Sequence, residues 1–293
     1  MSRASTRAHH TMAEIMPRLA LPVLVCALLA HAAAAEAEWV LDTEGGLVYE
    51  DNLTRATREA DRRSGIAVAP ALSGGHYLQL TDAISLQATA DFKGSLYPEL
   101  ERLSHLTSTV TLGVRGKLGL GTFAPWLRVF AGGGALVSGD EVRDSLLVDT
   151  GIQAGKRLSE RISVQGGYTY ESADARNNVF NGSSHTLSLT GTAELTAALQ
   201  LTVGYAIRWG DLVIHRAPVP GAPRAPHERL VDTFDTPLVA ARIDATTHLF
   251  SVTVSYALGP HAALNAGYEY QISFGPFFEY PNNVVRASLG LSF

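Results

Sequence analysis

Strict alternation of apolar and polar residues is the feature that most restricts how this chain can fold. Over residues 84–96, every even position, from Ile84 to Leu96, is apolar or small, and every odd position is polar or charged. Successive side chains of a β-strand point to opposite faces, so this run has one apolar face and one polar face. It is also longer than the usual strand of about 5–6 residues. The segment therefore predicts a long strand between two different environments.

The same alternation recurs along most of the chain. Residues 262–272, for example, place Leu264, Tyr268 and Ile272 on one face and Asn265 and Glu269 on the other. Counting every such segment predicts twelve strands, over residues 38–49, 64–79, 84–97, 104–118, 123–137, 144–157, 161–172, 184–195, 199–213, 245–257, 262–272 and 284–293. The second is the least regular, because Pro70 and Gly74–Gly75 interrupt it, and we expect a bulge or kink there.

The connections between these segments alternate in length. Short links near 81–82, 118–121, 159–160, 196–198 and 259–260 alternate with longer ones at 50–63, 98–103, 138–143, 173–183, 214–244 and 273–283. Short turns at one end and long loops at the other are typical of bacterial outer-membrane barrels. We predict an all-β fold, a 12-stranded antiparallel up-and-down transmembrane β-barrel. The proline-rich loop 214–244 is expected to be irregular and exposed.

A soluble β-sandwich would alternate too, and three observations favour the barrel over it. The strands are long enough to cross a bilayer at a tilt, which takes about 9–11 residues. Only 17% of all residues are charged, and the polar faces are rich in Ser, Thr, Gln and Gly. Aromatic residues lie near strand ends, where we expect them on the apolar face as two interfacial girdles: Trp39, Tyr49, Trp126, Tyr168, Tyr170, Tyr205, Trp209, Tyr256, Tyr268 and Tyr270.

The first residues have the pattern of an export signal. A short apolar run, 19–30, follows Arg18 and precedes the small residues Ala32–Ala35. A basic flank, a short apolar core and an A-x-A site are typical of a cleaved secretory signal. We predict a signal peptide over 1–35 and a barrel domain over 36–293, with cleavage after Ala35 or Ala37; translation could start at Met1, Met12 or Met16. The single cysteine, Cys26, falls in the removed segment.

The last strand carries a resemblance to a known class. It alternates from Val285 to Leu291 and stops at the aromatic Phe293. Together with the export signal and the alternation, this resembles Gram-negative outer-membrane β-barrel proteins of the porin-like kind. The segment Tyr49–Arg55 is similar to openings of uncharacterised proteobacterial barrels. The resemblance implies a place in the cell outer membrane, contact with its lipid and lipopolysaccharide, and recognition by the barrel-assembly machinery through a C-terminal insertion signal that includes Phe293.

The polar faces supply the candidate functional residues. Five cations come from four adjacent predicted strands, near their short-turn ends, and would form a basic wall: Arg115, Lys117, Arg128, Arg157 and Arg161. Further lumen candidates are Asp91, Lys93 and Arg208. Rings of charge tune the selectivity of pores, so the wall predicts a preference for anions. Alternatively, these cations form a structural ladder with lumen acids such as Asp42 and Glu194, because buried charges are normally paired.

We therefore predict a porin-like channel for passive diffusion of small hydrophilic solutes, anionic ones among them, with two alternatives. An outer-membrane lipid hydrolase would need a Ser–His pair, but the adjacent Ser184 and His185 point to opposite faces of one strand. A non-conducting structural or adhesive barrel would act through loops such as the charged segment 50–63, which otherwise reads as a solvated rim. The scattered histidines predict no metal site, no cofactor motif occurs, and the net charge of -5 argues against nucleic acid.

Overall fold

The structure is a computed structural model, and it describes residues 38–221, 225–234, 236–275 and 278–293. Residues 39–293 form one compact unit, to which the following description applies. The predicted signal peptide, 1–35, lies outside the described residues. Among the described residues, no helix is long and apolar enough to cross a membrane.

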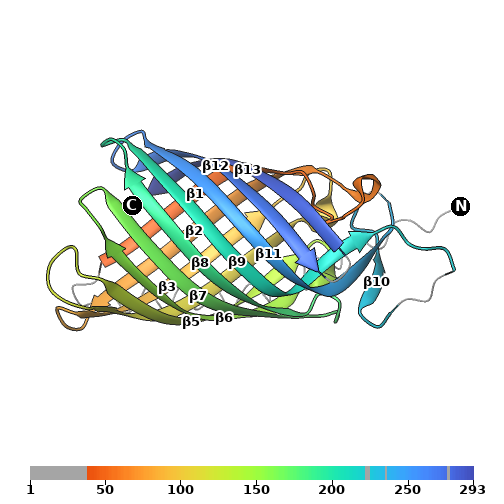
Figure 1. The fold of residues 1–293 in the computed structure, drawn as a ribbon, viewed down its shortest axis with the longest axis horizontal. Helices are drawn as coiled ribbons and strands as arrows, with labels where there is room; N and C mark the ends of the chain where they lie inside the picture. The colour runs from red at the N-terminus through yellow and green to blue at the C-terminus, as the bar shows by residue number, and fades with distance from the viewer. Residues whose placement is uncertain (1–37, 222–224, 235, 276–277) are drawn as a thin grey trace, which may run out of the picture. The chain divides into compact units, whose positions relative to one another are not determined.

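Twelve long strands close into an antiparallel barrel (Figure 1). Neighbours in sequence pair with one another, β1 pairs with β13, and β9 pairs with β11 to complete the ring. The short strand β10 pairs with the end of β11 outside this ring. The strands are β1 Glu38–Glu50, β2 Gly65–Gln79, β3 Ile84–Ser95, β4 His105–Lys117, β5 Trp126–Ser138, β6 Ser145–Arg157, β7 Ile162–Ala175, β8 Gly182–Glu194, β9 Leu199–Arg216, β10 Glu228–Val231, β11 Leu238–Ala257, β12 Ala262–Gly275 and β13 Phe278–Ser292.

All twelve predicted strands are found, and the main differences are at one end of the barrel. β11 begins at Leu238 rather than at 245, and β13 begins at Phe278 rather than at 284. The expected long loop 273–283 is therefore wrong, since only residues 276–277 separate β12 from β13. Pro and Asn are turn formers, so 281–283 resembled a loop. Pairing with β12 overrides that local preference.

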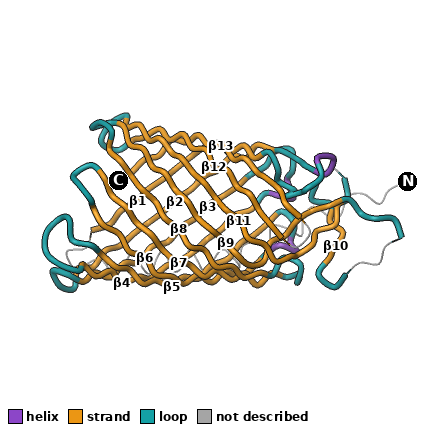
Figure 2. Tube along the Cα trace, in the orientation of Figure 1, coloured by secondary structure: helices purple, strands orange, loops and turns teal. Residues whose placement is uncertain are grey.

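The barrel has two different ends (Figure 2). At what we call the turn end, the connections are residues 80–83, 118–125, 158–161, 195–198 and 258–261. At the loop end, the described connections are residues 51–64, 96–104, 139–144 and 176–181 and the described parts of 217–237, which include β10. Three single-turn 3-10 helices lie in these loops: η1 Glu59–Asp61, η2 Glu101–Leu103 and η3 Glu141–Arg143. The predicted alternation of short and long connections is confirmed in part: 118–125 at the turn end is longer than 139–144 and 176–181 at the loop end, and the connection between β12 and β13 is short.

The bulge expected in β2 is absent from its pairing with β3. The register runs without interruption from Ala71 to Gln79, and Val68 stays in step with Leu96. Pro70 fits because the facing residue, Gly94, leaves room: a Cβ on Gly94 would lie 3.0 Å from the Pro70 ring. Because a glycine on the neighbouring strand faces the proline, the proline does not interrupt the register of the two strands.

The outer surface of the barrel is a belt of exposed apolar side chains. Leu146 is 67% exposed and Leu112 is 61% exposed, values typical of a protein surface. A belt of this kind is what a barrel presents to lipid. The predicted aromatic residues Trp39, Tyr49 and Trp209 are exposed in the same belt, as are Tyr205, Tyr256 and Tyr268.

The buried core lies at the loop end. Leu53, Leu103, Phe234 and Leu238 form one apolar cluster, contributed by three different loops and the start of β11. Val179, Val231 and Ala240 form a second. The expectation that 214–244 is irregular and exposed is therefore wrong, and so is the view of 50–63 as only a solvated rim. Apolar residues scattered among prolines and charges meet only when the loops fold over the barrel end.

Candidate functional site

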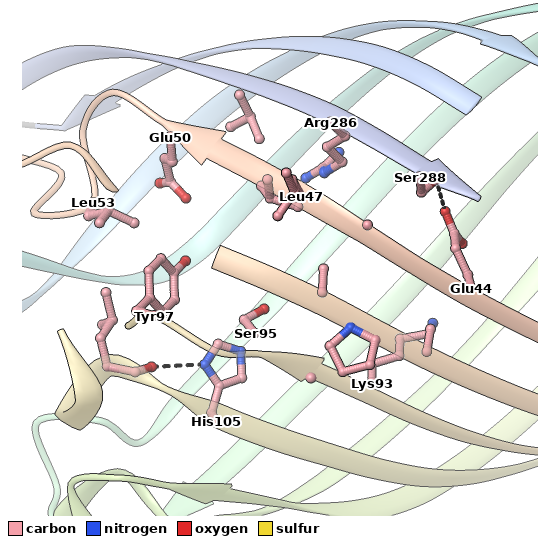
Figure 3. Close-up of a pocket in the computed structure, with 18 of the residues that line it drawn as sticks. Glu44, Leu47, Glu50, Leu53, Lys93, Ser95, Tyr97, His105, Arg286 and Ser288 are labelled. Atoms are coloured by element: carbon pink, nitrogen blue, oxygen red, sulfur yellow. Dashed lines mark hydrogen bonds between the residues drawn. The ribbon is translucent and has the colours of Figure 1, made fainter. Parts of the chain in front are cut away.

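The polar faces of the twelve strands line the barrel lumen, and the described residues form cavities in it, two of which concern us. Each has a volume of about 560 Å³. The loop-end cavity lies under the folded loops, with Glu50, Tyr97 and His105 around it (Figure 3). The mid-barrel cavity is lined by threonines of β4 and by Asp91, Asp149 and Glu171. Both cavities are lined by Arg55 and Lys93, so these two cations stand where the cavities adjoin.

The predicted basic wall lies at the turn end: four of its cations are on the adjacent strands β4, β5 and β6, and Arg161 lies in the connection before β7 and not on a strand. Arg115 of β4 and Arg128 of β5 are direct cross-strand partners. Two like charges in this position repel one another unless something stabilises them. Arg115 lies over the ring of Trp126, 4.4 Å from its centroid, and Arg128 lies 5.0 Å from the centroid of Phe130. Aromatic faces attract cations, so these rings hold the two guanidinium groups without carboxylates.

The position of Trp126 corrects the sequence analysis, which placed it in an outer girdle. Trp126 pairs with Lys117, and it therefore shares the lumen face with Lys117, Arg115 and Arg128. Gly155 of β6 leaves room for it: a Cβ there would lie 2.4 Å from the indole ring. The residue belongs to the cation site and not to the lipid-facing belt.

The other wall cations have different partners. The Arg157 guanidinium lies 3.9 Å from the Glu194 carboxylate, and both side chains are half exposed. Arg157 also donates a hydrogen bond to the carbonyl of Glu160. For Lys117, Arg161, Arg115 and Arg128, no carboxylate lies within ion-pair distance in the described part of the chain. The ladder interpretation thus holds for Arg157 alone.

The mid-barrel cavity contains the acidic candidates. Asp149 of β6 pairs with Glu171 of β7 in register, and Asp91 lines the same cavity. Gly132 makes room for Asp149, because a Cβ on Gly132 would lie 2.5 Å from its Oδ1. The predicted lumen residues Lys93 and Arg208 also line this cavity, so carboxylates and cations face each other across it.

Asn52 holds the loop 51–64 against the barrel end. Its Nδ2 donates hydrogen bonds to the carbonyls of Ala56 and Pro281, both at 3.1 Å. Its Oδ1 accepts from Thr54 Oγ1 and from the Ala56 amide. Its own amide donates to Asn282 Oδ1 of β13. Asn52 is 1% exposed, and all of these bonds are buried except the one to the Pro281 carbonyl, which is partly buried.

Further contacts fix this loop to the strands β9 and β13. The His215 amide of β9 donates to the Thr54 carbonyl at 2.9 Å, and the His215 ring packs edge-on against Phe234. The Asn283 side chain donates to Asp51. Strands β9 and β13 therefore anchor one short segment, and that segment covers part of the lumen.

Two arginines of the loop end face this lumen. Arg55 follows the buried turn and has a φ of 54°, the left-handed conformation that few residues other than Gly adopt. Arg143 of η3 lies 5.4 Å from the centroid of the Phe180 ring, and its Nη1 is buried without a hydrogen-bond partner among the described residues. Burial, and then neighbouring Arg55, lower the pKa of Arg143 to about 10. The side chain is still charged at neutral pH.

Tyr97 is next to these cations and is the one titratable phenol of the loop-end cavity. Burial, and then the charge of Glu50, raise the pKa of Tyr97 to about 12, so the hydroxyl keeps its proton at neutral pH. It can therefore donate a hydrogen bond into the cavity.

Ser184 and His185 lie on opposite sides of β8, as their adjacency predicts. Ser184 faces the lumen, is buried and donates to Glu171 at 3.4 Å. The His185 ring stacks on Trp209, and its Nδ1 lies 2.7 Å from the Tyr168 hydroxyl. This arrangement gives the serine no imidazole base. In the described part of the chain, no group of His, Cys, Asp and Glu side chains is arranged to hold a metal ion.

The sequence analysis missed Asn52, Arg55 and Arg143 as functional residues. Arg55 was counted within a charged loop and Arg143 within a connection, because alternation identifies lumen residues only inside strands. A weak signal existed in Asn52-Leu53-Thr54, which places an apolar residue between two side chains that often bond to the backbone.

No family model matches the chain, and no curated protein matches it. Among solved structures, the chain is similar to an outer-membrane channel from Pseudomonas putida F1, with a TM-score of 0.60, 13% identity, and coverage of 89% of this chain and 97% of that one. The NanC porin has a TM-score of 0.44 and 10% identity, over 86% of this chain and 98% of that one. The first likeness shows the fold, that of an outer-membrane β-barrel.

Proposed function

We propose that the protein is an outer-membrane channel for the passive diffusion of small hydrophilic solutes, with a preference for anions. The observation that carries this proposal is the state of the lumen charges. Arg55, Arg115, Arg128 and Arg143 have no carboxylate partner among the described residues. The lumen acids Glu44, Glu50, Glu171 and Glu269, by contrast, accept hydrogen bonds from neighbouring side chains.

Unpartnered cations at both ends of a lumen attract anions from either side. A charge that is stacked on an aromatic ring keeps its full field, whereas a charge beside a carboxylate is largely cancelled. In the mid-barrel cavity, Asp91, Asp149 and Glu171 share the lining with Lys93 and Arg208, so its charge is mixed and we expect the positive ends to set the preference. This proposal includes the location: the exposed apolar belt needs lipid around it.

Planar-bilayer recording tests the proposal. The purified barrel is inserted between KCl solutions of tenfold different concentration, on the order of 1 M and 0.1 M, where the Debye length is about 3–10 Å. We expect steady single-channel current steps. We also expect a reversal potential whose sign shows that chloride is more permeant than potassium. Steady conductance with preference for potassium would refute the anion preference and leave the channel standing.

A non-conducting barrel is the second candidate, and the folded loop 51–64 favours it. Thr54 is fully buried and Asn52 nearly so, and their neighbours Leu53 and Arg55 line the loop-end cavity. If the loop closes the lumen, the wild-type protein gives no current while a variant that lacks the loop does. If neither the wild type nor the variant without the loop passes current, a structural role is favoured.

We also propose the partners that the C-terminal strand implies. The backbone of Phe293 exchanges two hydrogen bonds with Leu41 of β1, at 3.1 and 2.9 Å, next to the closure of the ring. Its ring is 66% exposed and stacks on His261. An exposed terminal aromatic is suited to recognition by the barrel-assembly machinery. Outer-membrane lipid and lipopolysaccharide would then surround the belt. Comparing the assembly of Phe293→Ala with that of the wild type in proteoliposomes with that machinery tests this role.

A further inference from the structure

We propose that the loop-end cavity is a binding site for a small organic carboxylate, held by Arg55 and Arg143 with its apolar body against the cavity wall. The inference deepens the proposed channel function by naming a class of solute for this part of the lumen, and it rests on that function for its physiological meaning. The binding itself is measurable whether or not the barrel conducts.

The first observation is an incomplete charge pair. The Arg143 guanidinium is packed against Phe180, its Nη1 is buried, and no described side chain accepts a hydrogen bond from that atom. Burying a guanidinium without a counter-charge is costly, so such groups normally have an anionic partner. The acid whose charge acts most on Arg143 is Asp140, whose Oδ2 accepts a hydrogen bond from Thr233.

The second observation is the placement of Arg55. Its left-handed backbone conformation is unfavourable for a residue with a side chain, and the buried network of Asn52 maintains it. The residue lines the loop-end cavity together with Arg143, and the charge of Arg55 disfavours the charge of Arg143. A carboxylate between them would relieve that repulsion and could accept bonds from both guanidinium groups.

The third observation is that no described acid of this cavity lies within ion-pair distance of Arg55 or Arg143. Glu44 accepts a hydrogen bond from Ser288, and Glu50 accepts one from Asn282 at 2.8 Å. Figure 3 shows Glu44 and Glu50 on the same strand, with Arg286 between them along the cavity wall. Arg286 lies 3.6 Å from Glu269. Among the described lining residues, Arg55, Arg143 and Lys93 are thus the cations with no carboxylate within ion-pair distance, and Arg55 and Arg143 are the two that lie in loops.

The remaining wall selects for a carboxylate with an apolar part. Apolar side chains line the cavity beside the arginines, and the Tyr97 hydroxyl can donate a hydrogen bond nearby. Inorganic ions gain nothing from such a wall, whereas a hydrocarbon body is removed from water against it. The apolar lining residues are Val48, Leu53, Leu103, Val213 and Val284.

Isothermal titration calorimetry on the full-length protein in detergent micelles tests the site. The probe is benzoate, and its uncharged counterpart benzamide has nearly the same shape. We expect benzoate to bind and benzamide to bind at least about tenfold more weakly, because charge-assisted hydrogen bonds are the stronger ones. Equal affinity for the two, or no benzoate binding, would overturn the proposal.

Variants locate the site. We expect Arg55→Gln and Arg143→Gln each to weaken benzoate binding about tenfold, the effect of one lost charge-assisted bond. Arg143→Lys keeps the charge and should retain part of the affinity even if Arg143→Gln folds poorly, which circular dichroism detects. The matched control is Arg157→Gln at the turn end, expected to leave the affinity unchanged; an equal loss there would contradict the assignment.

Conductance separates this inference from the proposed function. Benzoate binding by a barrel that passes no current would support the site and refute the channel. Current without benzoate binding would support the channel and refute the site. Binding together with current predicts that benzoate, but not benzamide, reduces the chloride current of the wild type and that Arg143→Gln abolishes this block.

Discussion

The two ends of the lumen hold unpaired arginines in opposite ways. At the turn end, Arg115 and Arg128 come from neighbouring strands and lie over Trp126 and Phe130 of the barrel wall itself. At the loop end, Arg55 and Arg143 come from loops, and a buried hydrogen-bond network holds one of them in a left-handed conformation. The first arrangement is local, and the second requires segments that are distant in sequence.

The two ends differ in what keeps each cation in position. A cation that stacks on the ring of its own sheet keeps its place as long as the sheet exists. A cation in a folded loop keeps its place only while Asn52, His215 and Asn283 hold that loop. We therefore expect the loop end to respond to single changes that leave the turn end unaffected, and the following experiments test that difference from the largest effect to the smallest.

The largest effect is expected from replacing residues 52–63 with a short Gly-Ser linker. The change removes the segment that covers the lumen, together with Arg55, while the barrel strands remain. We expect a several-fold increase in single-channel conductance, because the loop-end cavity becomes open to solution. Shortening the turn-end connection 118–125 is the control and should leave conductance near that of the wild type. An unchanged conductance after loop replacement would show that the constriction lies elsewhere.

Asn52→Ala should loosen the loop without removing it. The change leaves the Ala56 and Pro281 carbonyls and the Ala56 amide without their partners in a buried site. We expect a loss of about 2–4 kcal/mol in the free energy of unfolding, typical of a broken buried network. Urea unfolding in lipid vesicles measures it. Asn178→Ala, an exposed asparagine at the same end, should change stability little; equal losses would show that burial is not the cause.

Trp126→Leu tests the turn end. The variant keeps an apolar side chain but removes the ring under Arg115. We expect a loss of about 0.5–2 kcal/mol in stability, the usual range for a cation–π contact. The anion preference should fall as well, since Arg115 then loses its fixed position. Reversal potentials measure this second effect, with Trp39→Leu on the outer belt as the control. A preference that stays unchanged would remove the wall from the selectivity mechanism.

Gly132→Ala should lower stability by a smaller amount, and only because this position faces the lumen. A Cβ at this position would meet Asp149 Oδ1 at 2.5 Å and Thr111 Oγ1 at 2.8 Å, so both side chains must rotate away. We expect a cost of about 1 kcal/mol, because the ends of flexible side chains adapt. Gly133→Ala, one residue further, meets only the Leu147 carbonyl at 3.6 Å and should cost nothing. Equal costs in thermal unfolding would contradict the assigned faces.

The smallest effect is a pH dependence at the loop end. Glu228 of β10 accepts a hydrogen bond from Arg216 at 2.6 Å, which holds the pKa of Glu228 below its ordinary value of 4.5. Because the pKa of Glu228 is lower in the folded state than in the unfolded state, its ionised form stabilises the β10–β11 pair at a pH above the ordinary pKa. This stabilisation is lost as the pH falls through the folded-state pKa. Amide exchange of 228–231 should therefore quicken on acidification below about pH 4.5, relative to its intrinsic rate. In Glu228→Gln this extra acceleration should vanish; its persistence would implicate another group.

Much of the barrel follows from the sequence because its pattern is local. A residue's place inside or outside is decided by parity within each strand, so Arg128, Asp91 and Arg208 could be assigned to the lumen without coordinates. Trp126 was misassigned because an aromatic residue near a strand end resembles a girdle residue, although its parity equals that of Arg128. Here parity was the better guide, since the pleat leaves no choice of face.

The loops could not be predicted in the same way. Residues 52–54 are buried because Pro281, Asn282 and His215 happen to face them across the barrel end, and these partners are more than 160 positions away in the chain. No local rule joins residues at such a distance. Likewise, 278–283 is a strand because β12 offers it a complete ladder, despite its turn-forming residues.

The sequence by itself determined the number of long strands, their antiparallel order and the sides on which their charges lie. Alternation with a period of two encodes those features, and neighbouring strands need only short connections to pair. The tertiary structure alone decided which charges remain unpaired and how the loop end is covered. Those properties depend on contacts across the closed ring, where the partner of each side chain is set by the curvature of the whole barrel and not by its neighbours in sequence.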